Sequence, residues 1–274
     1  MSLDCYFNER LIKAIGQNLA KSTQLSELTL IGVHFSANAL QVLNDGLLKS
    51  VSLRKLRMNY CFSRPELLIK IFPALSSPSK LPLQELNLAA NGLTDLECGE
   101  ILSKILNQHC ENRDEIYWKY GLRGELPPHN ELSGLKLIDL SFNKLGERAC
   151  YNLGKTLKTD RYLLALNLRS NQITTEMAEQ MVKQLQENRT LFNLDLRDNV
   201  NISQKVYRKL ALKLLTSYTS TGQTTPADIW EREQKYFNSE LLVVQIPQSM
   251  VSSYAKKLEA IRTMTLSQVL TNES

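Results

Sequence analysis

A leucine-rich pattern returns along this chain at nearly constant spacing. It is clearest in LQELNLAANGL, which begins at residue 83 and places leucines and one asparagine in the order LxxLxLxxNxL. It recurs in LKLIDLSFNKL, LLALNLRSNQI and LFNLDLRDN, which begin at residues 135, 163 and 191, and in two weaker copies at residues 25 and 53. The successive intervals are 28, 30, 52, 28 and 28 residues. A period of this length is typical of proteins built from stacked repeats, which can form one elongated domain.

The interval of 52 residues contains one repeat and an insertion of about 24 residues, CENRDEIYWKYGLRGELPPHNELSG at 110–134. We interpret this insertion as a charged loop. Its aromatic residues Tyr117, Trp118 and Tyr120 are of the kind that anchors partners at protein interfaces. Alternatively, Trp118 packs the loop back onto the repeats, because a long loop needs a contact that holds it down. The two interpretations are compatible if Trp118 is buried and Tyr117 or Tyr120 is exposed.

Each repeat is predicted to be a short strand followed by a helix. In LxxLxL, alternating leucines point to one side of an extended segment, and the residues between them point to the other side. The apolar period then becomes helical. The predicted helical faces are Leu40, Leu43 and Leu47; Leu67, Ile71 and Leu75; Cys98, Leu102 and Ile105; Ala149, Leu153 and Leu157; Met177, Met181 and Leu185; and Val206, Leu210 and Leu214. We therefore predict an α/β leucine-rich-repeat solenoid, with a curved parallel sheet inside and helices outside. A further helix within residues 6–22, with Leu11, Ile15 and Leu19 on one face, would cap the first strand.

An asparagine follows the strand in four of the six repeats, at Asn91, Asn143, Asn171 and Asn199. An amide side chain supplies both donors and acceptors to the backbone of adjacent turns, so stacked repeats would form an asparagine ladder. Val33 and Cys61 occupy the equivalent positions of the first two repeats. We expect these two repeats to be more loosely held, or to satisfy their backbone groups with water.

The rhythm of the repeats ends at Leu215. Residues 1–215 are therefore predicted to be the repeat domain, with the insertion at 110–134. Residues 216–240 read as a linker, rich in Ser, Thr, Gly and Pro, followed by a short helix. Residues 241–274 read as a strand and a helix that form a small C-terminal cap or a docking arm. The apolar stretch 241–246 is expected to cover the far end of the array or, alternatively, to pair with another chain.

Charge and motifs exclude several classes of function. The net charge of +5 comes without a basic run, which argues against nucleic acid or an anionic membrane as partner. No apolar segment is long enough for a membrane helix, the first residues do not resemble a secretory signal, and five irregularly spaced cysteines fit an intracellular, reduced protein. Phosphate-binding, dinucleotide-binding and zinc motifs are missing, and the chain has only three histidines. We therefore expect a protein without enzyme activity, metal, cofactor or small-molecule substrate.

The concave inner surface is the remaining candidate for function. Its side chains are those between the core leucines of each strand, and they are mixed in charge. Arginine forks on such a surface can bridge carboxylates of a protein partner. The alternative is an ordinary solvated surface. The candidate partner-binding residues of this surface are Arg57, Asn59, Asp139, Asn167, Arg169, Asp195 and Arg197.

The 28-residue period, with LxxLxLxxN and then a full helix, resembles the ribonuclease-inhibitor-like class of leucine-rich repeats, whose members are mostly protein-binding scaffolds. More narrowly, residues 10–215 resemble the repeat domain of a family of centrosomal proteins of about seventy-eight kilodaltons. The resemblance is carried by the placement of the insertion NRDEIYWKYGLRGELP and by LALNLRSNQITTEMAEQMVKQLQENRTLFNLDLRDN. It implies a cytoplasmic, non-enzymatic scaffold of the centriole or basal body that supports cilium formation and engages a ubiquitin-ligase assembly. The alternative is an axonemal subunit similar to the leucine-rich-repeat member of the dynein regulatory complex.

Overall fold

A single parallel sheet runs through the computed structural model, which describes residues 3–33, 35–62, 64–128 and 131–219. The strands follow one another in chain order, and each pairs with the next in parallel. They are β1 (Glu27–Ile31), β2 (Lys55–Asn59), β3 (Glu85–Asn87), β4 (Leu137–Asp139), β5 (Ala165–Asn167) and β6 (Asn193–Asp195). The α/β solenoid predicted from the repeats is confirmed.

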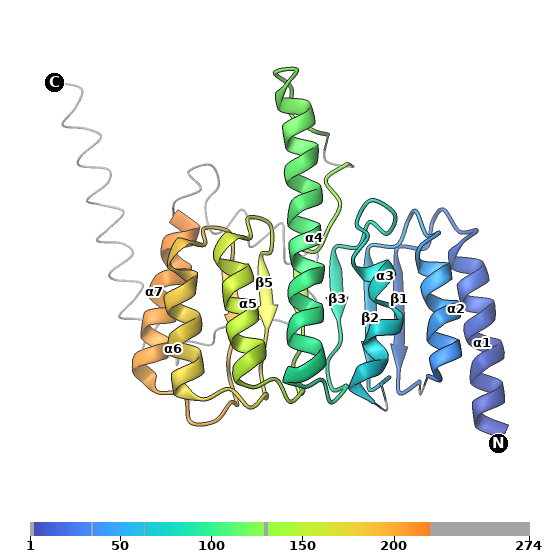
Figure 1. The fold of residues 1–274 in the computed structure, drawn as a ribbon, viewed down its shortest axis with the longest axis horizontal. Helices are drawn as coiled ribbons and strands as arrows, with labels where there is room; N and C mark the ends of the chain where they lie inside the picture. Colours follow the sequence, from blue (N-terminus) through green and yellow to red (C-terminus); the bar gives the residue numbers. More distant parts are fainter. Residues whose placement is uncertain (1–2, 34, 63, 129–130, 220–274) are drawn as a thin grey trace.

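A row of helices covers one face of this sheet (Figure 1). They are α1 (Leu3–Leu19), α2 (Ala37–Leu47), η1 (Pro65–Lys70), α3 (Phe72–Leu75), α4 (Asp95–Gly121), α5 (Glu147–Thr159), α6 (Thr175–Gln184), η2 (Leu185–Glu187) and α7 (Gln204–Thr219). The opposite face of the sheet carries the side chains that alternate with the core leucines. We call it the sheet face.

The core lies between the sheet and the helices. Leu86, Leu140, Leu168 and Leu196 are each at most 1% exposed, as the alternation of the pattern requires. Burying one leucine side chain contributes about 1.5 to 3 kcal/mol, so the stacked leucines stabilise each repeat. A strand with its helix could not bury these side chains alone, which is why the repeats stack.

An asparagine ladder joins the turns that follow the strands. The Nδ2 group of Asn143 donates to the backbone oxygen of Leu88 in the preceding repeat at 3.1 Å and to that of Leu140 at 2.9 Å. Its Oδ1 atom accepts from the backbone N–H groups of Asn91 at 2.9 Å and Leu93 at 3.0 Å. The same arrangement, a donor to the preceding repeat and an acceptor for its backbone, is made by Asn91, Asn171 and Asn199.

A thiol replaces the amide in the second repeat. The Sγ atom of Cys61 donates to the backbone oxygens of Leu30 and Asn59, both at 3.3 Å, and the side chain is fully buried. Burial raises the pKa of this thiol, so it stays protonated and able to donate. In the first repeat, by contrast, Leu28 is only half-buried. The expectation that the first two repeats are more loosely held, or satisfy their backbone groups with water, stays a prediction.

The helix predicted across Leu67, Ile71 and Leu75 is divided in two before Pro73. Pro65 lies in the first turn of the 3-10 helix η1, and Pro73 lies in the first turn of α3. A proline has no N–H group to continue a helix that is already formed, so Pro73 starts a new one. The three apolar side chains are still buried, but the prediction of one continuous helix is wrong.

Helix α1 packs closely against α2 at the N-terminal end of the array (Figure 1). A Cβ atom on Gly46 would lie 2.5 Å from the Cα atom of Gly16, so the two helix backbones approach more closely than any side chain would permit. The predicted capping helix is confirmed, although its buried face includes Ile12, whereas Leu11 is 44% exposed.

The first half of the insertion is helical, so its interpretation as a loop is wrong for these residues. Helix α4 continues from the third repeat to Gly121, so residues 110–121 are helical and not part of a loop. Figure 1 shows its outer end projecting beyond the row of helices. With 27 residues against 13 in α5, it extends about 20 Å further than its neighbour. The segment CENRDEIYWKYG contains no proline, and nothing in it interrupts a helix.

The last described helix, α7, ends at Thr219, so it includes the first four residues of the predicted linker. The predicted short helix, strand and C-terminal cap at 220–274 lie outside the described residues. Among the helices that are described, none is both long and apolar enough to cross a membrane.

Candidate protein-binding surfaces

The strand register brings the predicted residues of the sheet face into two rows. Arg57 pairs with Asn87, which pairs in turn with Asp139, Asn167 and Asp195 on the following strands. The second row lies two residues further along the chain in each repeat, and it includes Asn59, Arg169 and Arg197. The register thus brings Arg57, Asp139, Asn167 and Asp195 to matching positions on adjacent strands, and the binding role of the seven residues stays a prediction.

Arg57 lies between carboxylates of the neighbouring strands. It is ion-paired with Glu27 on β1, and its second terminal nitrogen lies 3.9 Å from Glu85 on β3. Glu85 also accepts from Lys55 at 2.8 Å. At this end of the sheet face the arginine is already held by side chains of its own chain.

Asp139 is a buried carboxylate in the middle of the first row. Its oxygens accept from the Asn87 amide at 3.1 Å and from the backbone N–H of Ser141 at 2.9 Å. Burial raises the pKa of this carboxyl, while the bonds from Ser141 and Asn167 act in the opposite direction. Its role in the structure is to link adjacent strands through hydrogen bonds.

The C-terminal end of the sheet face holds two arginine and aspartate pairs. The Nε atom of Arg197 lies 2.9 and 3.0 Å from the two oxygens of Asp195, and Nη2 completes a bidentate pair. The hydrogen bonds that Arg197 donates to the carboxylate of Asp195 raise the pKa of the arginine. Arg169 donates to Asp198 at 2.6 Å, and its guanidinium lies 5.8 Å from the ring centre of Phe142.

Asn59 and Asn167 differ in how they use their amide groups. The Oδ1 atom of Asn167 accepts from the backbone of Arg169 at 3.0 Å. The Oδ1 atom of Asn59 is buried and has no hydrogen-bond partner among the described residues. Together with the ion pairs, these contacts make the sheet face a preorganised surface of paired charges and amides.

The base of the projecting part of α4 is clamped to the repeats. Arg113 is 3% exposed, and it donates to the backbone oxygens of Ser133 at 2.8 Å, Leu135 at 3.2 Å and Gly134. Its guanidinium also lies 4.8 Å from the ring centre of Tyr162. This cation therefore joins the helix to the segment that leads into β4.

His109 makes a second clamp one turn earlier. Its Nε2 atom lies 2.6 Å from the backbone oxygen of Leu75, and its Nδ1 atom accepts from the N–H of Leu135 at 2.9 Å. Burial lowers the pKa of His109 to about 4, so the imidazole is neutral at pH 7. The tautomer with the proton on Nε2 fits both contacts, because one nitrogen then donates and the other accepts.

The aromatic residues of the insertion have three different environments. Tyr117 stacks on Tyr162 with ring centres 6.2 Å apart, and Tyr120 donates to Glu131 at 2.8 Å. Trp118 is 65% exposed. The interpretation that Trp118 packs the insertion onto the repeats is therefore wrong, because Arg113, His109 and Tyr117 provide that contact. No sequence pattern indicated Tyr162, which lies 45 residues after Tyr117.

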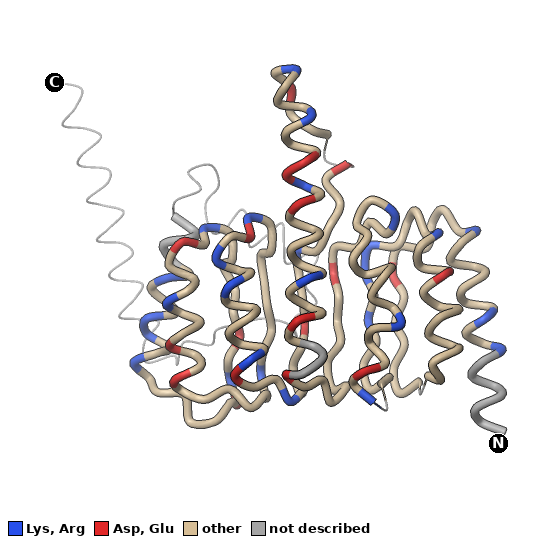
Figure 2. The backbone as a smooth tube through the Cα atoms, viewed as in Figure 1, with Lys and Arg blue, Asp and Glu red and all other residues tan. Residues whose placement is uncertain are grey.

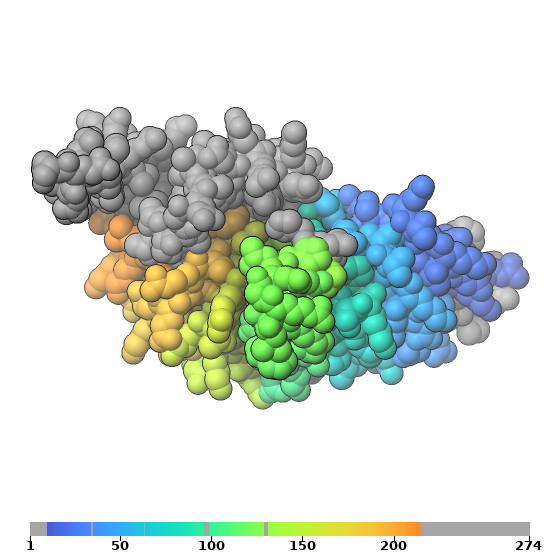
Figure 3. Space-filling model, turned by 90° about the horizontal axis from the view of Figure 1, so that it is seen from above, coloured from blue at the N-terminus to red at the C-terminus, as the bar shows by residue number. Residues whose placement is uncertain are grey.

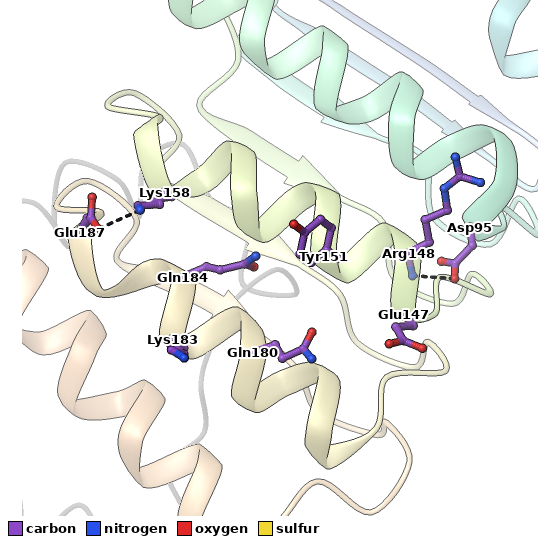
Figure 4. A pocket seen from close by; sticks show the side chains of 9 residues that line it. All are labelled: Asp95, Glu147, Arg148, Tyr151, Lys158, Gln180, Lys183, Gln184 and Glu187. Carbon is purple, nitrogen blue, oxygen red and sulfur yellow. Dashed lines mark hydrogen bonds and ion pairs between the residues drawn. The ribbon is translucent and has the colours of Figure 1, made fainter.

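A groove between α5 and α6 was not predicted (Figure 4). It has a volume of about 970 Å³ and is lined by charged and amide side chains, including Arg148, Lys158, Lys183 and Gln184. Lys158 is paired with Glu187 across it at 3.0 Å. The sequence carries no motif for this groove.

The described part of the chain contains no group of three or more His, Cys, Asp or Glu side chains arranged to hold a metal ion. The buried carboxylates Asp139 and Asp195 are engaged in structural contacts on separate strands.

Comparison with known proteins adds to this geometry. Centrosomal protein of 78 kDa from Homo sapiens is 30% identical over 207 residues, which is 75% of this chain and 30% of that protein. The chain has a leucine-rich-repeat fold, as its six-stranded parallel sheet with outer helices shows. Its repeats resemble those of Centrosomal protein of 78 kDa, also in Mus musculus, where identity is 26% over 76% of this chain and 22% of the relative. The chain thus spans less than a third of the length of these relatives.

No protein-family model matches this leucine-rich-repeat chain. Among solved structures, the tropomodulin C-terminal domain of Caenorhabditis elegans aligns with a TM-score of 0.43 and 12% identity, over 77% of this chain and 95% of that domain. Leiomodin-1 actin-binding site 2 aligns with a TM-score of 0.41 and 11% identity, over 83% and 95% of the two chains.

Proposed function

We propose that this leucine-rich-repeat protein is a non-enzymatic scaffold that binds protein partners at the centrosome. The location is supported by the similarity to Centrosomal protein of 78 kDa, whose name places that protein at the centrosome. The mode of action is supported by the sheet face, where Arg57, Arg169 and Arg197 are each held by a carboxylate of the chain.

The preorganisation of these three arginines is the observation that supports a binding role most directly. Ordering a long side chain when a partner binds costs about 0.5 to 1.5 kcal/mol, and a side chain already held in place avoids most of this cost. A guanidinium in an ion pair still has N–H groups that can meet an acidic or carbonyl group of a partner. The adjacent paired carboxylates offer acceptors on the same surface.

The location can be tested with a fluorescent fusion in cells of the source organism. We expect it to colocalise with a centriolar marker and to remain there after the axoneme is stripped. The finer alternative, an axonemal subunit, predicts a periodic signal along the ciliary shaft. A diffuse signal that does not follow either structure would contradict both.

The role of the sheet face requires a matched pair of variants. Arg57→Gln with Arg169→Gln removes two of its cations, and Arg148→Gln with Lys158→Gln removes two ion-paired cations from the helix side. We expect the first variant to lose recruitment to the centrosome while circular dichroism remains unchanged. The second should be recruited normally. Equal recruitment of both would show that the sheet face is not the contact surface.

We further propose that the partners include centriolar proteins and a ubiquitin-ligase assembly, and that the protein supports cilium formation from the basal body. These roles are implied by the family resemblance of residues 10–215. Affinity capture with reconstitution from purified ligase subunits tests the first, and counting ciliated cells after depletion tests the second. Capture that is equal for the wild type and for the sheet-face variant would place the ligase contact elsewhere on the chain.

A further inference from the structure

The outer half of α4 has one face in contact with the rest of the chain and an opposite face that is exposed. The first face contacts the rest of the chain through four side chains, those of His109, Arg113, Tyr117 and Tyr120. Residues three or four positions apart lie above one another on a helix. The opposite face is therefore formed by Glu111, Glu115, Trp118 and Leu122, and we call it the arm face.

The arm face exposes two large apolar side chains at the end of the helix. Trp118 is 65% exposed and Leu122 is 68% exposed, four residues further along. The indole of Trp118 makes no ring contact and no side-chain hydrogen bond with the other described residues. An isolated exposed leucine is ordinary, but a tryptophan and a leucine side by side on a projecting helix are the composition of an interface anchor.

The surroundings of this apolar pair are acidic. The charged side chains of the projecting part that are not buried comprise five carboxylates and two cations: Glu111, Asp114, Glu115, Glu125 and Glu131, with Lys119 and Arg123. The chain as a whole has a net charge of +5, so the acidic excess is local. Figure 2 shows acidic positions along the projecting half of α4, below its tip.

The projecting half of α4, which carries the arm face and is called the arm below, is fixed to the repeats at its base. Arg113 and His109 fix its base, and the hydroxyl of Tyr162 donates to Asp114 at 2.7 Å. Seen from above in Figure 3, the tip of α4 stands between the parts of the array on either side. A surface that is already ordered pays little entropy when a partner docks.

We propose that the arm face binds a basic amphipathic helix of a partner protein. The apolar side chains of that helix would pack on Trp118 and Leu122, and its lysines or arginines would meet Glu111 and Glu115. In the free chain Glu115 is ion-paired with Lys119 at 2.7 Å, so a cation of the partner would share this carboxylate. Two helices pack through such ridges at three- and four-residue spacing, which the arm face presents. The acidic excess disfavours an anionic membrane or a nucleic acid at the same place. This inference rests on the proposed role of the protein as a partner-binding scaffold.

Binding can be measured by the fluorescence of Trp118 in the full chain. Because the chain has a second tryptophan, Trp230→Phe is made first so that Trp118 is the only one. The probe is a synthetic amphipathic helix of about five turns, with leucines on one face and lysines on the other. A second peptide has glutamate in place of each lysine. We expect a blue shift with the lysine peptide, an affinity at least about tenfold above that of the glutamate peptide, and weakening by salt.

Two variants locate the binding. Glu111→Lys with Glu115→Lys reverses the charge of the arm face and should reduce the affinity for the lysine peptide by about tenfold or more. Glu176→Lys with Glu179→Lys makes the same change on exposed positions of α6 and should leave it unchanged. Leu122→Ala should weaken binding without changing the salt dependence.

Several outcomes would overturn the proposal. Equal affinity for the lysine and glutamate peptides would show that charge does not select the partner. Equal loss of affinity in the two charge-reversal variants would show that the peptide does not bind at the arm face. Sedimentation that reveals a dimer abolished by Trp118→Ala would identify a second copy of the chain as the occupant instead. Peptide binding is measured on purified protein, whereas the proposed centrosomal role is measured by recruitment in cells, so either can fail without the other.

Discussion

The Nε atom of Arg113 donates a hydrogen bond of 2.8 Å to the backbone oxygen of Ser133, and this contact closes the insertion at its base. The two residues are 20 positions apart, near the two ends of the segment that interrupts the repeats. Ser133 in turn donates from Oγ to the backbone oxygen of Pro78 at 2.8 Å. The insertion is thereby joined to the end of the second repeat by a buried polar chain rather than by its tryptophan.

Replacing Arg113 by lysine should destabilise this base. A lysine has no planar fork, so it cannot donate to Ser133, Gly134 and Leu135 together. Buried acceptors that lose their partners cost free energy, and we expect a loss of roughly 2 to 4 kcal/mol in the free energy of unfolding. Urea denaturation measures this loss, and hydrogen exchange should become faster at 133–135.

Arg123→Lys is the matched control for that experiment, because Arg123 is exposed at the tip of the arm. It should change the free energy of unfolding by less than about 0.5 kcal/mol. If Arg113→Lys were equally mild, the clamp would not be what holds the arm to the repeats.

Trp118→Ala should have little effect on stability. Its ring is mostly exposed, so its removal should change the free energy of unfolding by less than about 0.5 kcal/mol. Thermal denaturation is the measurement, and acrylamide quenching of Trp118 in the Trp230→Phe chain checks its exposure directly. A loss of several kcal/mol would restore the interpretation that this ring packs the insertion onto the repeats.

Because His109 is buried and neutral, we expect the free energy of unfolding to depend on pH. The pKa of His109 is lowered from 6.5 to about 4 in the folded chain, so the unfolded state binds a proton between these values that the folded state does not bind. The contribution of the neutral His109 to the free energy of unfolding is fully present above pH 6.5. It is lost as the pH falls toward 4, by an amount on the order of 3 kcal/mol.

The test compares the free energy of unfolding of the wild type and of His109→Gln between pH 7 and pH 4. Glutamine does not titrate, so the difference between the two proteins should shrink as the pH falls. Burial raises the pKa of Asp139 and Asp160, and both carboxyls act in the opposite direction, but they are the same in both proteins. A difference that stays constant with pH would contradict the neutral, buried imidazole.

Asn143→Ala should weaken the contact between two repeats. The substitution leaves the backbone oxygens of Leu88 and Leu140 and the N–H groups of Asn91 and Leu93 without their partner. We expect a loss of roughly 2 to 4 kcal/mol by chemical denaturation. Asn107→Ala, an exposed position on α4, is the control and should be nearly neutral.

Much of the solenoid was predictable because its stabilising contacts repeat with the sequence. Leu86 and Leu168 alternate with polar residues, and that alternation fixes which side of the strand is buried. Asn91 and Asn171 recur at the turn, where an amide can serve two repeats at once. The rows of the sheet face follow from the same register, so Arg57 and Asp195 were placed on it without coordinates.

The insertion was predicted less well, since its contacts do not repeat. The helical continuation to Gly121 was readable from the absence of a breaker, but it was interpreted as a loop. That Arg113 is buried and Trp118 exposed could not be read from their neighbours in sequence. The partners that decide it, Tyr162 and the backbone of 133–135, lie in segments remote from them along the chain.

The sequence alone determined the period, the alternation of strands and helices and the sheet face, because each depends on residues within one repeat or on the same position in the next. The tertiary structure decided which side of α4 is anchored, which arginines are paired and where Trp118 points. Those outcomes depend on distances between segments that no periodicity relates, and a buried cation such as Arg113 is stable only where folding brings acceptors to it.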